Sequence, residues 1–136
     1  MNDDCHGYFG RIAILTEDGE LLVTCGLVGS GGGTVYYYGK QRMGDDYVLQ
    51  QSIGFEKGVV SLAVDGNSMV VTEFQGLDSP CVIRFFVRRN ITWVEVTRID
   101  GPTLDERVWS EVALFGNQTL IASGKNVYPM QDYFNP

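Results

Sequence analysis

The feature that most constrains the fold is a pattern of strands and turns that recurs about every 47 residues. Asp18-Gly19 recurs at Asp65-Gly66, 47 residues further on, and Gly116 follows Gly66 by 50 residues. These turns separate short runs of apolar and β-branched residues, and glycine supplies the positive φ that tight hairpin turns need. A repeat in this range with four strands per unit is typical of β-propeller blades.

The runs between the turns predict an all-β chain of antiparallel strands, arranged as one domain over residues 1–136. Two four-stranded repeats are expected at about 9–55 and 57–103, and a partial third at about 107–130, where Pro129 ends the last strand. Apolar runs that do not alternate indicate inner strands covered on both faces. The predicted strands cover residues 11–16, 21–25, 34–38, 47–53, 59–64, 68–72, 81–87, 92–99, 109–114, 119–123 and 126–128.

Charge and hydropathy limit the partners of the chain. The 136 residues carry a net charge of −7 with a pI near 4.5, so the average field repels a polyanion and nucleic-acid binding is disfavoured. No apolar run reaches the ~18 residues that a membrane span needs. The polar, acidic start lacks the features of a signal peptide. If Met1 is the natural start, we expect an intracellular protein, of a size that suits a compact viral or microbial genome.

The first repeat resembles a known family. The likeness covers residues 8–53 well, 57–101 fairly and 109–128 partially. It rests on Phe9-Gly10-Arg11, Ala13-Ile14, the turn at Gly19, Leu22-Val23, Gly33-Thr34-Val35-Tyr36, and Val48-Leu49-Gln50-Gln51. These motifs resemble the FG-GAP repeat, which forms the blades of integrin α-subunit head propellers and of many microbial propeller proteins. The resemblance implies blade-like repeats of four antiparallel strands.

The chain departs from this family in two ways. Calcium-binding members carry an Asp-x-Asp-x-Asp-Gly loop between the first two strands, but here the turns at 17–20, 65–67 and 116–117 are too short for the ~6–8 oxygen ligands of Ca²⁺. We therefore expect no metal and no cofactor. A closed propeller needs ~4–8 blades. We expect a partial propeller that a two-fold homodimer completes. The alternatives are a fragment of a longer chain, or repeats collapsed into a β-sandwich or barrel.

Sites for phosphate binding or catalysis are poorly supported by the sequence. In the glycine-rich loop 29–33 the dinucleotide fingerprint fails at Thr34, and a P-loop fails at Gln41, so a loop between strands is favoured. The only histidine, His6, lies near the N-terminus, which disfavours a catalytic triad or a common zinc site.

Acidic pairs and cysteines complete the set of reactive groups. Solvated loop acids are the expected role of Asp45-Asp46 and of Asp105-Glu106 with Glu111. We therefore expect no enzymatic activity. The odd number and wide spacing of Cys5, Cys25 and Cys81 predict buried or unpaired thiols. Two glycosylation motifs begin at Asn90 and Asn117, with no secretion signal to support them.

A candidate interaction surface combines arginines with aromatic side chains. The arginines at 84, 88, 89 and 98 could bind an anion, but pairing with Glu95 and nearby acids is favoured by the negative net charge. The aromatic residues suit blade packing, whereas an exposed subset would suit a protein-binding hot spot. The candidate residues are Arg84, Arg88, Arg89, Tyr37, Tyr47 and Trp93.

The expected function is a non-enzymatic protein-interaction or structural module of FG-GAP-like repeats that assembles with itself. Another protein could bind its loops at 26–33, 40–46, 73–80 and 100–108, since loops on a β scaffold often carry function. One alternative is a calcium-independent adhesion or ligand-binding fragment of a larger extracellular propeller. The other is a β-scaffold hydrolase, which would need convergent acids.

Overall fold

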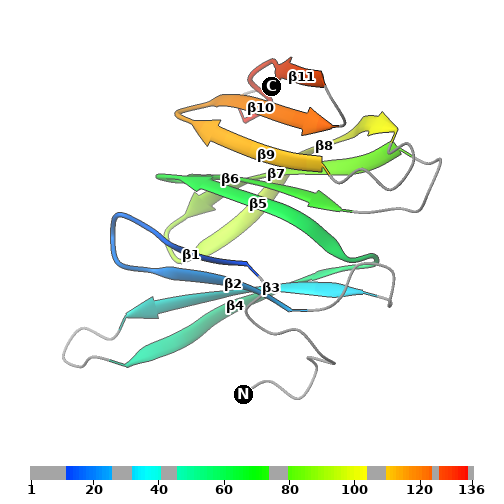
Figure 1. The fold of residues 1–136 in the computed structure, drawn as a ribbon. Helices are drawn as coiled ribbons and strands as arrows, with labels where there is room; N and C mark the ends of the chain where they lie inside the picture. The colour runs from blue at the N-terminus through cyan, green and yellow to red at the C-terminus, as the bar shows by residue number, and fades with distance from the viewer. Residues whose placement is uncertain are drawn as a thin grey trace. The chain divides into compact units, whose positions relative to one another are not determined.

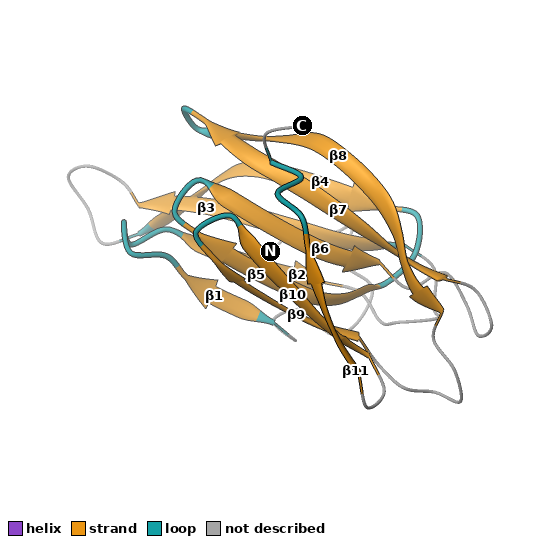
Figure 2. Ribbon diagram, turned by 90° about the horizontal axis from the view of Figure 1, so that it is seen from above, coloured by secondary structure: helices purple, strands orange, loops and turns teal. Residues whose placement is uncertain are grey.

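The computed structural model describes residues 12–25, 32–40, 46–73, 80–103, 110–123 and 126–134. Every regular element in these residues is a β-strand, and all the strand pairs are antiparallel (Figures 1 and 2). The predicted all-β class is therefore confirmed. Closure into a propeller, completion by a homodimer, and the sandwich or barrel alternative stay predictions.

The strands form three sheets, and each sheet follows the order of the chain. The orders are β1-β2-β3-β4, β5-β6-β7-β8 and β9-β10-β11, called here the first, second and third sheet. This meander is the arrangement that the repeat predicted. The strands are β1 (Ala13–Leu15), β2 (Leu21–Cys25), β3 (Gly33–Lys40), β4 (Tyr47–Phe55), β5 (Val59–Asp65), β6 (Ser68–Glu73), β7 (Pro80–Arg89), β8 (Thr92–Thr103), β9 (Ser110–Phe115), β10 (Gln118–Ser123) and β11 (Asn126–Met130).

One strand end was predicted wrongly. Pro129 does not terminate the last strand but lies inside β11, directly opposite Leu120 of β10. Because β11 is an edge strand, it pairs on one side only, and a proline without an N–H group is tolerated there.

The hairpin turns follow the glycine signals of the sequence. Gly66 and Gly116 have φ values of 59° and 60° and begin the two-residue turns between β5 and β6 and between β9 and β10. Asn90, with φ of 61°, does the same between β7 and β8. Glycine and asparagine are the residues that adopt this left-handed conformation at least cost. The β1–β2 connection is longer and has Gly19 at φ of 80°.

The chain divides into two units, Met1–Val59 and Val60–Pro136. The first unit holds the first sheet, and the second unit holds the second and third sheets. The prediction of a single domain stays a prediction, and the units are described separately below.

Inner strands of both units are covered on both faces, as the apolar runs predicted. Neighbouring residues on a strand point to opposite faces. In the first unit, Tyr36 and Tyr37 of β3 are both fully buried. In the second unit, Met69, Val70 and Val71 of β6 are all fully buried.

The second unit is built on packing between the second and third sheets. Its core contains Val70, Cys81, Ile83 and Phe85 of the second sheet and Ile121 of the third. The β6 and β9 strands lie side by side (Figure 1). Burial of these side chains stabilises the unit by roughly 1.5–3 kcal/mol for each large residue.

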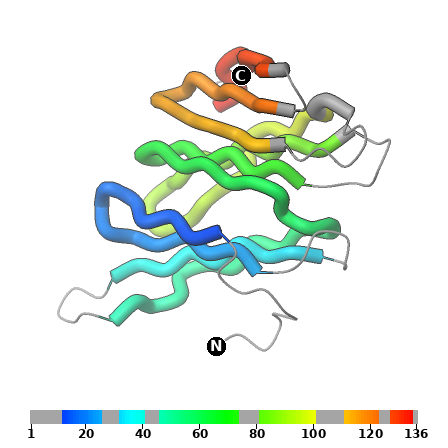
Figure 3. Tube along the Cα trace, in the orientation of Figure 1, coloured from blue at the N-terminus to red at the C-terminus, as the bar shows by residue number. Residues whose placement is uncertain are grey.

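The segment after β11 returns to this core. Its Phe134 ring meets the Phe85 ring edge-on at 5.3 Å, and the Tyr133 ring lies 5.0 Å from Phe85 between centroids. The Thr97 hydroxyl donates a hydrogen bond to the Tyr133 carbonyl at 3.0 Å. The residues after the last strand therefore take the space on the inner side of the third sheet (Figure 3).

Polar contacts fix the alignment of the two hairpin turns in the second unit. The Gly116 N–H donates to the Asp65 carboxylate at 2.5 Å, and the Ser68 hydroxyl donates to the Asn117 side-chain oxygen at 3.0 Å. The Asn117 amide in turn donates to Asp132 at 3.3 Å. Equivalent turns 50 residues apart are thus joined directly, which sets the register between the two sheets.

Two glycines at the start of β3 are required by close packing. A Cβ atom at Gly32 would lie 2.5 Å from the Phe55 carbonyl oxygen, and one at Gly33 would lie 3.1 Å from the Val59 backbone nitrogen. The Gly33 N–H also donates to the Lys57 carbonyl at 3.2 Å. These glycines therefore have a packing role, while residues 26–31 of the predicted loop lie outside the described residues.

We expect Gly32→Ala to destabilise the protein by about 1–3 kcal/mol, because the backbone of Phe55 cannot move aside freely. Gly54→Ala is the matched control, since a Cβ there meets nothing within 4 Å and φ is not in the left-handed region. Its effect should stay within about 0.5 kcal/mol of zero or be stabilising. Urea denaturation measures both, and equal effects would contradict the packing role.

Candidate interaction surface

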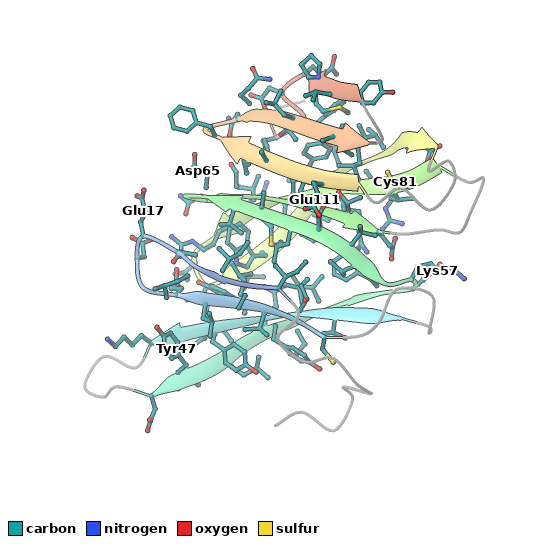
Figure 4. All side chains as sticks on the ribbon, in the orientation of Figure 1. Glu17, Tyr47, Lys57, Asp65, Cys81 and Glu111 are labelled. Carbon is teal, nitrogen blue, oxygen red and sulfur yellow. The ribbon has the colours of Figure 1, made fainter. Side chains whose placement is uncertain are left out.

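The six candidate residues do not form one exposed surface. Tyr37 and Trp93 are buried, with 0% and 3% of their surface exposed. Tyr47, at the start of β4, is 40% exposed (Figure 4). Tyr37 and Tyr47 belong to the first unit, and the other four belong to the second. The sequence therefore did not show which of these six side chains are exposed to solvent.

The register of the second sheet assigns the arginines to faces. Directly paired residues of antiparallel strands point to the same face. Arg88 pairs with Trp93, Phe86 with Glu95, and Arg84 with Arg98, so all six side chains share one face. Phe85 pairs with Thr97 and Phe86 with Glu95, so β8 has one extra residue, Val96, at this bulge. Because of this extra residue, Glu95 and Arg98 point to the same face although they are three positions apart. Arg89 points to the opposite face.

Arg84 is the centre of a cluster of charged groups. Its Nε atom lies 2.5 Å from Glu95 Oε1, and its Nη1 atom lies 4.0 Å from Glu73 Oε2. The Arg84 and Glu73 side chains are only 11% and 4% exposed. The guanidinium also lies 5.6 Å from the centre of the Phe86 ring. Carboxylates therefore already compensate the Arg84 charge, and it is poorly placed to bind an external anion.

Glu95 also pairs with Arg98, whose Nη2 atom lies 3.1 Å from Glu95 Oε2. The favoured alternative, in which the arginines pair with Glu95 and nearby acids, is confirmed for Arg84 and Arg98. Burial acts to raise the pKa of Glu95, but the hydrogen bonds and charges of the two arginines outweigh it, so the pKa lies below its usual value.

Arg88 has a structural contact at the other end of β7. Its Nε atom donates to the Asn67 side-chain oxygen at 3.0 Å, and its backbone N–H donates to the Asn67 carbonyl at 2.8 Å. These bonds join β7 to the β5–β6 turn. The side chain of Arg89 is exposed.

Tyr37 also has a structural role. Its hydroxyl donates a hydrogen bond to the Glu20 carboxylate in the β1–β2 turn. Burial, with a smaller effect of the Asp18 charge, raises the Tyr37 pKa above its usual value, so the hydroxyl stays protonated at neutral pH. The bond fastens the turn to β3.

Tyr47 lies near an apolar row on the first sheet. Leu15, Leu21, Tyr38 and Leu49 are successive cross-strand partners from β1 to β4, and they point to one face. Leu15 and Leu49, at the two edges, are 64% and 42% exposed. We call these four residues the first-sheet row.

A larger apolar surface lies on the third sheet. Phe115 is 85% exposed, Val127 63% and Leu120 40%. Strand alternation and the pairing of Leu120 with Ala113 and Pro129, and of Ala122 with Val127, assign these side chains to one face. The third-sheet outer face is defined as Ala113, Phe115, Leu120, Ala122, Val127 and Pro129.

The sequence contains a signal for this surface in the composition of β9 and β10. Residues 112–115 and 119–122 are apolar or nearly so on both faces of their strands. In a sheet with one face in water, alternate residues would be polar. The outer face of the third sheet therefore has the composition of a covered face.

The predicted binding loops and most acidic candidates cannot be placed. Residues 41–45, 74–79 and 104–108 of these loops lie outside the described residues, as do His6, Asp45, Asp105 and Glu106. Residues 100–103 lie in β8, so the prediction of a loop there was wrong. Asp46 and Glu111 are exposed and belong to different units. No cluster of His, Cys, Asp and Glu that could hold a metal occurs among the described residues. No helix in that part of the chain is long and apolar enough to cross a membrane.

The cysteines differ from the prediction at one position. Cys25, at the end of β2, is disulfide-bonded, so the expectation of an unpaired thiol was wrong there. Spacing along the chain is a poor guide to pairing, because folding brings residues that are distant in sequence together. Cys81 is a fully buried thiol in the core of the second unit, as predicted. Cys5 lies outside the described residues.

The two glycosylation motifs differ in accessibility. Asn90 and Thr92 are both exposed at the β7–β8 turn. Asn117 is held by Asp132 and Ser68, and the Thr119 of its motif is fully buried. Only the motif at Asn90 therefore presents both of its key side chains to solvent.

Comparison with known proteins gives no further guide, since no protein-family model, no curated protein and no solved structure matches the chain.

We expect Glu95→Gln to lower the free energy of unfolding at pH 7 by roughly 1–3 kcal/mol, because it removes a charged acceptor from a half-buried arginine. The folded-state pKa of Glu95 lies below the unfolded value of about 4.3, so this stabilisation is complete above that pH. It is lost as the pH falls through the folded-state pKa. Urea midpoints at several pH values should show the wild-type advantage shrinking towards pH 3.

The exposed carboxylate of Glu56 provides the control. Glu56→Gln should have little effect at any of these pH values. A wild-type advantage over Glu95→Gln that stays constant from pH 7 to pH 3 would contradict the charge-based account.

Proposed function

We propose that this chain is a non-enzymatic structural or protein-interaction module, built from FG-GAP-like propeller repeats, that assembles with copies of itself. The repeat organisation supports the proposal. Each sheet is a meander in chain order, and the β5–β6 and β9–β10 hairpins have the same two-residue turn 50 residues apart. In the second unit, consecutive sheets pack face to face, as neighbouring blades do.

The observation that carries the proposal is the third-sheet outer face. Its large side chains, Phe115, Leu120 and Val127, are 85%, 40% and 63% exposed. Contiguous apolar surface of this kind usually marks a contact with another molecule. Within the described residues, nothing covers Phe115, and a sheet with two apolar faces is stable only when both are covered.

The proposal concerns assembly and not catalysis. The arginines that suggested ligand binding contribute instead to internal structure: Arg84 and Arg98 pair with Glu95, and Arg88 binds Asn67. Tyr37 and Trp93, the aromatic candidates, are buried. Arg84, Arg88 and Tyr37 thus contribute to the fold, Arg89 is exposed, and the apolar faces are the surfaces that we propose for partners.

A second function, as a calcium-independent adhesion or ligand-binding fragment of a larger extracellular propeller, is favoured by two observations. Cys25 is disulfide-bonded, and disulfides persist mainly in oxidising compartments. The Asn90 motif is exposed at a hairpin turn, where glycosylation acceptors are used. In this alternative, further blades of the same chain would cover the apolar faces.

Light scattering on a sizing column tests the first proposal. We expect a mass near twice the 15.1 kDa of one chain at protein concentrations between about 1 μM and 1 mM. Added salt should strengthen the association, because it screens the repulsion between chains of net charge −7. A mass of one chain throughout this range would contradict self-assembly.

A further inference from the structure

We infer that the third-sheet outer face is the contact between copies, packed against the same face of a second chain across a two-fold axis. This inference rests on the proposed self-assembly and specifies its interface. The first-sheet row, the other exposed apolar surface, is the competing location.

The internal repeat indicates what kind of surface covers this face. Val70 is the third residue of β6, and Leu120, 50 residues later, is the third residue of β10. Both follow a two-residue turn that begins with a left-handed glycine. Val70 is fully buried against Ile121 and Phe134, whereas Leu120 is 40% exposed. The face that a β-sheet covers in one repeat is therefore uncovered in the next, and another sheet is the fitting occupant.

The described residues after β11 do not provide this cover. Tyr133 and Phe134 contact Phe85 of the second sheet. They therefore fill the inner side of the third sheet, and the described residues up to Phe134 leave Phe115 and Val127 of the outer face exposed.

Contact by this face is favoured over pairing at the β11 edge. β11 is an edge of the third sheet, and Pro129 lies in its middle. Proline has no N–H group to donate, which makes this edge a poor template for an added strand. Pairing at the β11 edge is thus disfavoured, while the other edge strand, β9, contains no proline.

The third-sheet outer face can pack against a copy of itself. Its large and small side chains alternate on β9, where Phe115 follows Ala113, and on β10 the polar Gln118, opposite Phe115, is followed by Leu120 and Ala122. Two such faces, related by a two-fold axis, can place large residues of one copy over small residues of the other. The only charged residue that alternation assigns to this face, Glu111, lies at one end of β9, so two copies can meet without burying a carboxylate centrally.

Substitution on the two apolar surfaces tests the inference in the full chain. Phe115→Ser and Val127→Ser alter side chains that are exposed in the single chain, so both variants should keep the wild-type thermal midpoint at concentrations where the chains are dissociated. We expect each to weaken self-association by about tenfold or more, measured as the dimer dissociation constant by sedimentation equilibrium. Leu49→Ser, on the first-sheet row, is the matched control and should leave the dissociation constant within about twofold.

Each other outcome overturns a different part of the account. If Leu49→Ser weakens association while Phe115→Ser does not, the contact lies on the first-sheet row and the inference is wrong. If the wild type associates and none of the three variants changes it, the inference is wrong while the proposed function stands. If the wild type remains a single chain at all concentrations, self-assembly itself is overturned.

Discussion

A β-strand with apolar side chains on both faces must be covered on both faces, because each uncovered side chain keeps unfavourable contact with water. This requirement is met for the second sheet, where Met69, Val70 and Val71 are fully buried in succession. Layers of sheet stacked on sheet are the simplest arrangement that satisfies it. Among the described residues, no further sheet follows the third, and its outer face therefore has no sheet to cover it.

Hydrogen bonds between polar groups fix how the second and third sheets are aligned, whereas apolar side chains account for most of the buried surface. Apolar packing between sheets is tolerant of sliding, whereas hydrogen bonds are directional. The contacts of Asp65 with Gly116 and of Ser68 with Asn117 join two equivalent turns. Arg84 likewise holds Glu95 across β7 and β8 with little exposure to solvent. A buried charge is costly unless it is paired, which explains why Arg84 is held by carboxylates of its own sheet.

The sequence was a good guide to the strands and turns. Glycines at 66 and 116 marked turns because few other residues adopt their backbone conformation, and the regular spacing indicated the meanders. Prediction from the sequence was wrong where a residue's role depends on which strands lie beside it in the fold. Pro129 was expected to end a strand, but the edge position of β11 removes the hydrogen bond that proline would lose.

Exposure and pairing were the other properties that the sequence could not give. Tyr37 and Trp93 are residue types that are common in protein-binding hot spots, yet both are buried. The disulfide of Cys25 depends on which residues meet in space, and spacing along the chain does not give this. The third-sheet outer face was missed because Phe115 and Leu120 read equally well as core residues, and only the sheet order shows that no further layer follows in the described chain.

The central claim is that a second copy covers the third-sheet outer face, and side-chain protection as a function of protein concentration tests it most directly. Hydroxyl-radical footprinting reports the solvent exposure of individual residues. Phe115 should become protected as the concentration passes through the association range, while Ile91, which is 55% exposed at the β7–β8 turn, should react at a constant rate. Unchanged reactivity of Phe115 in a sample that has associated would contradict the account.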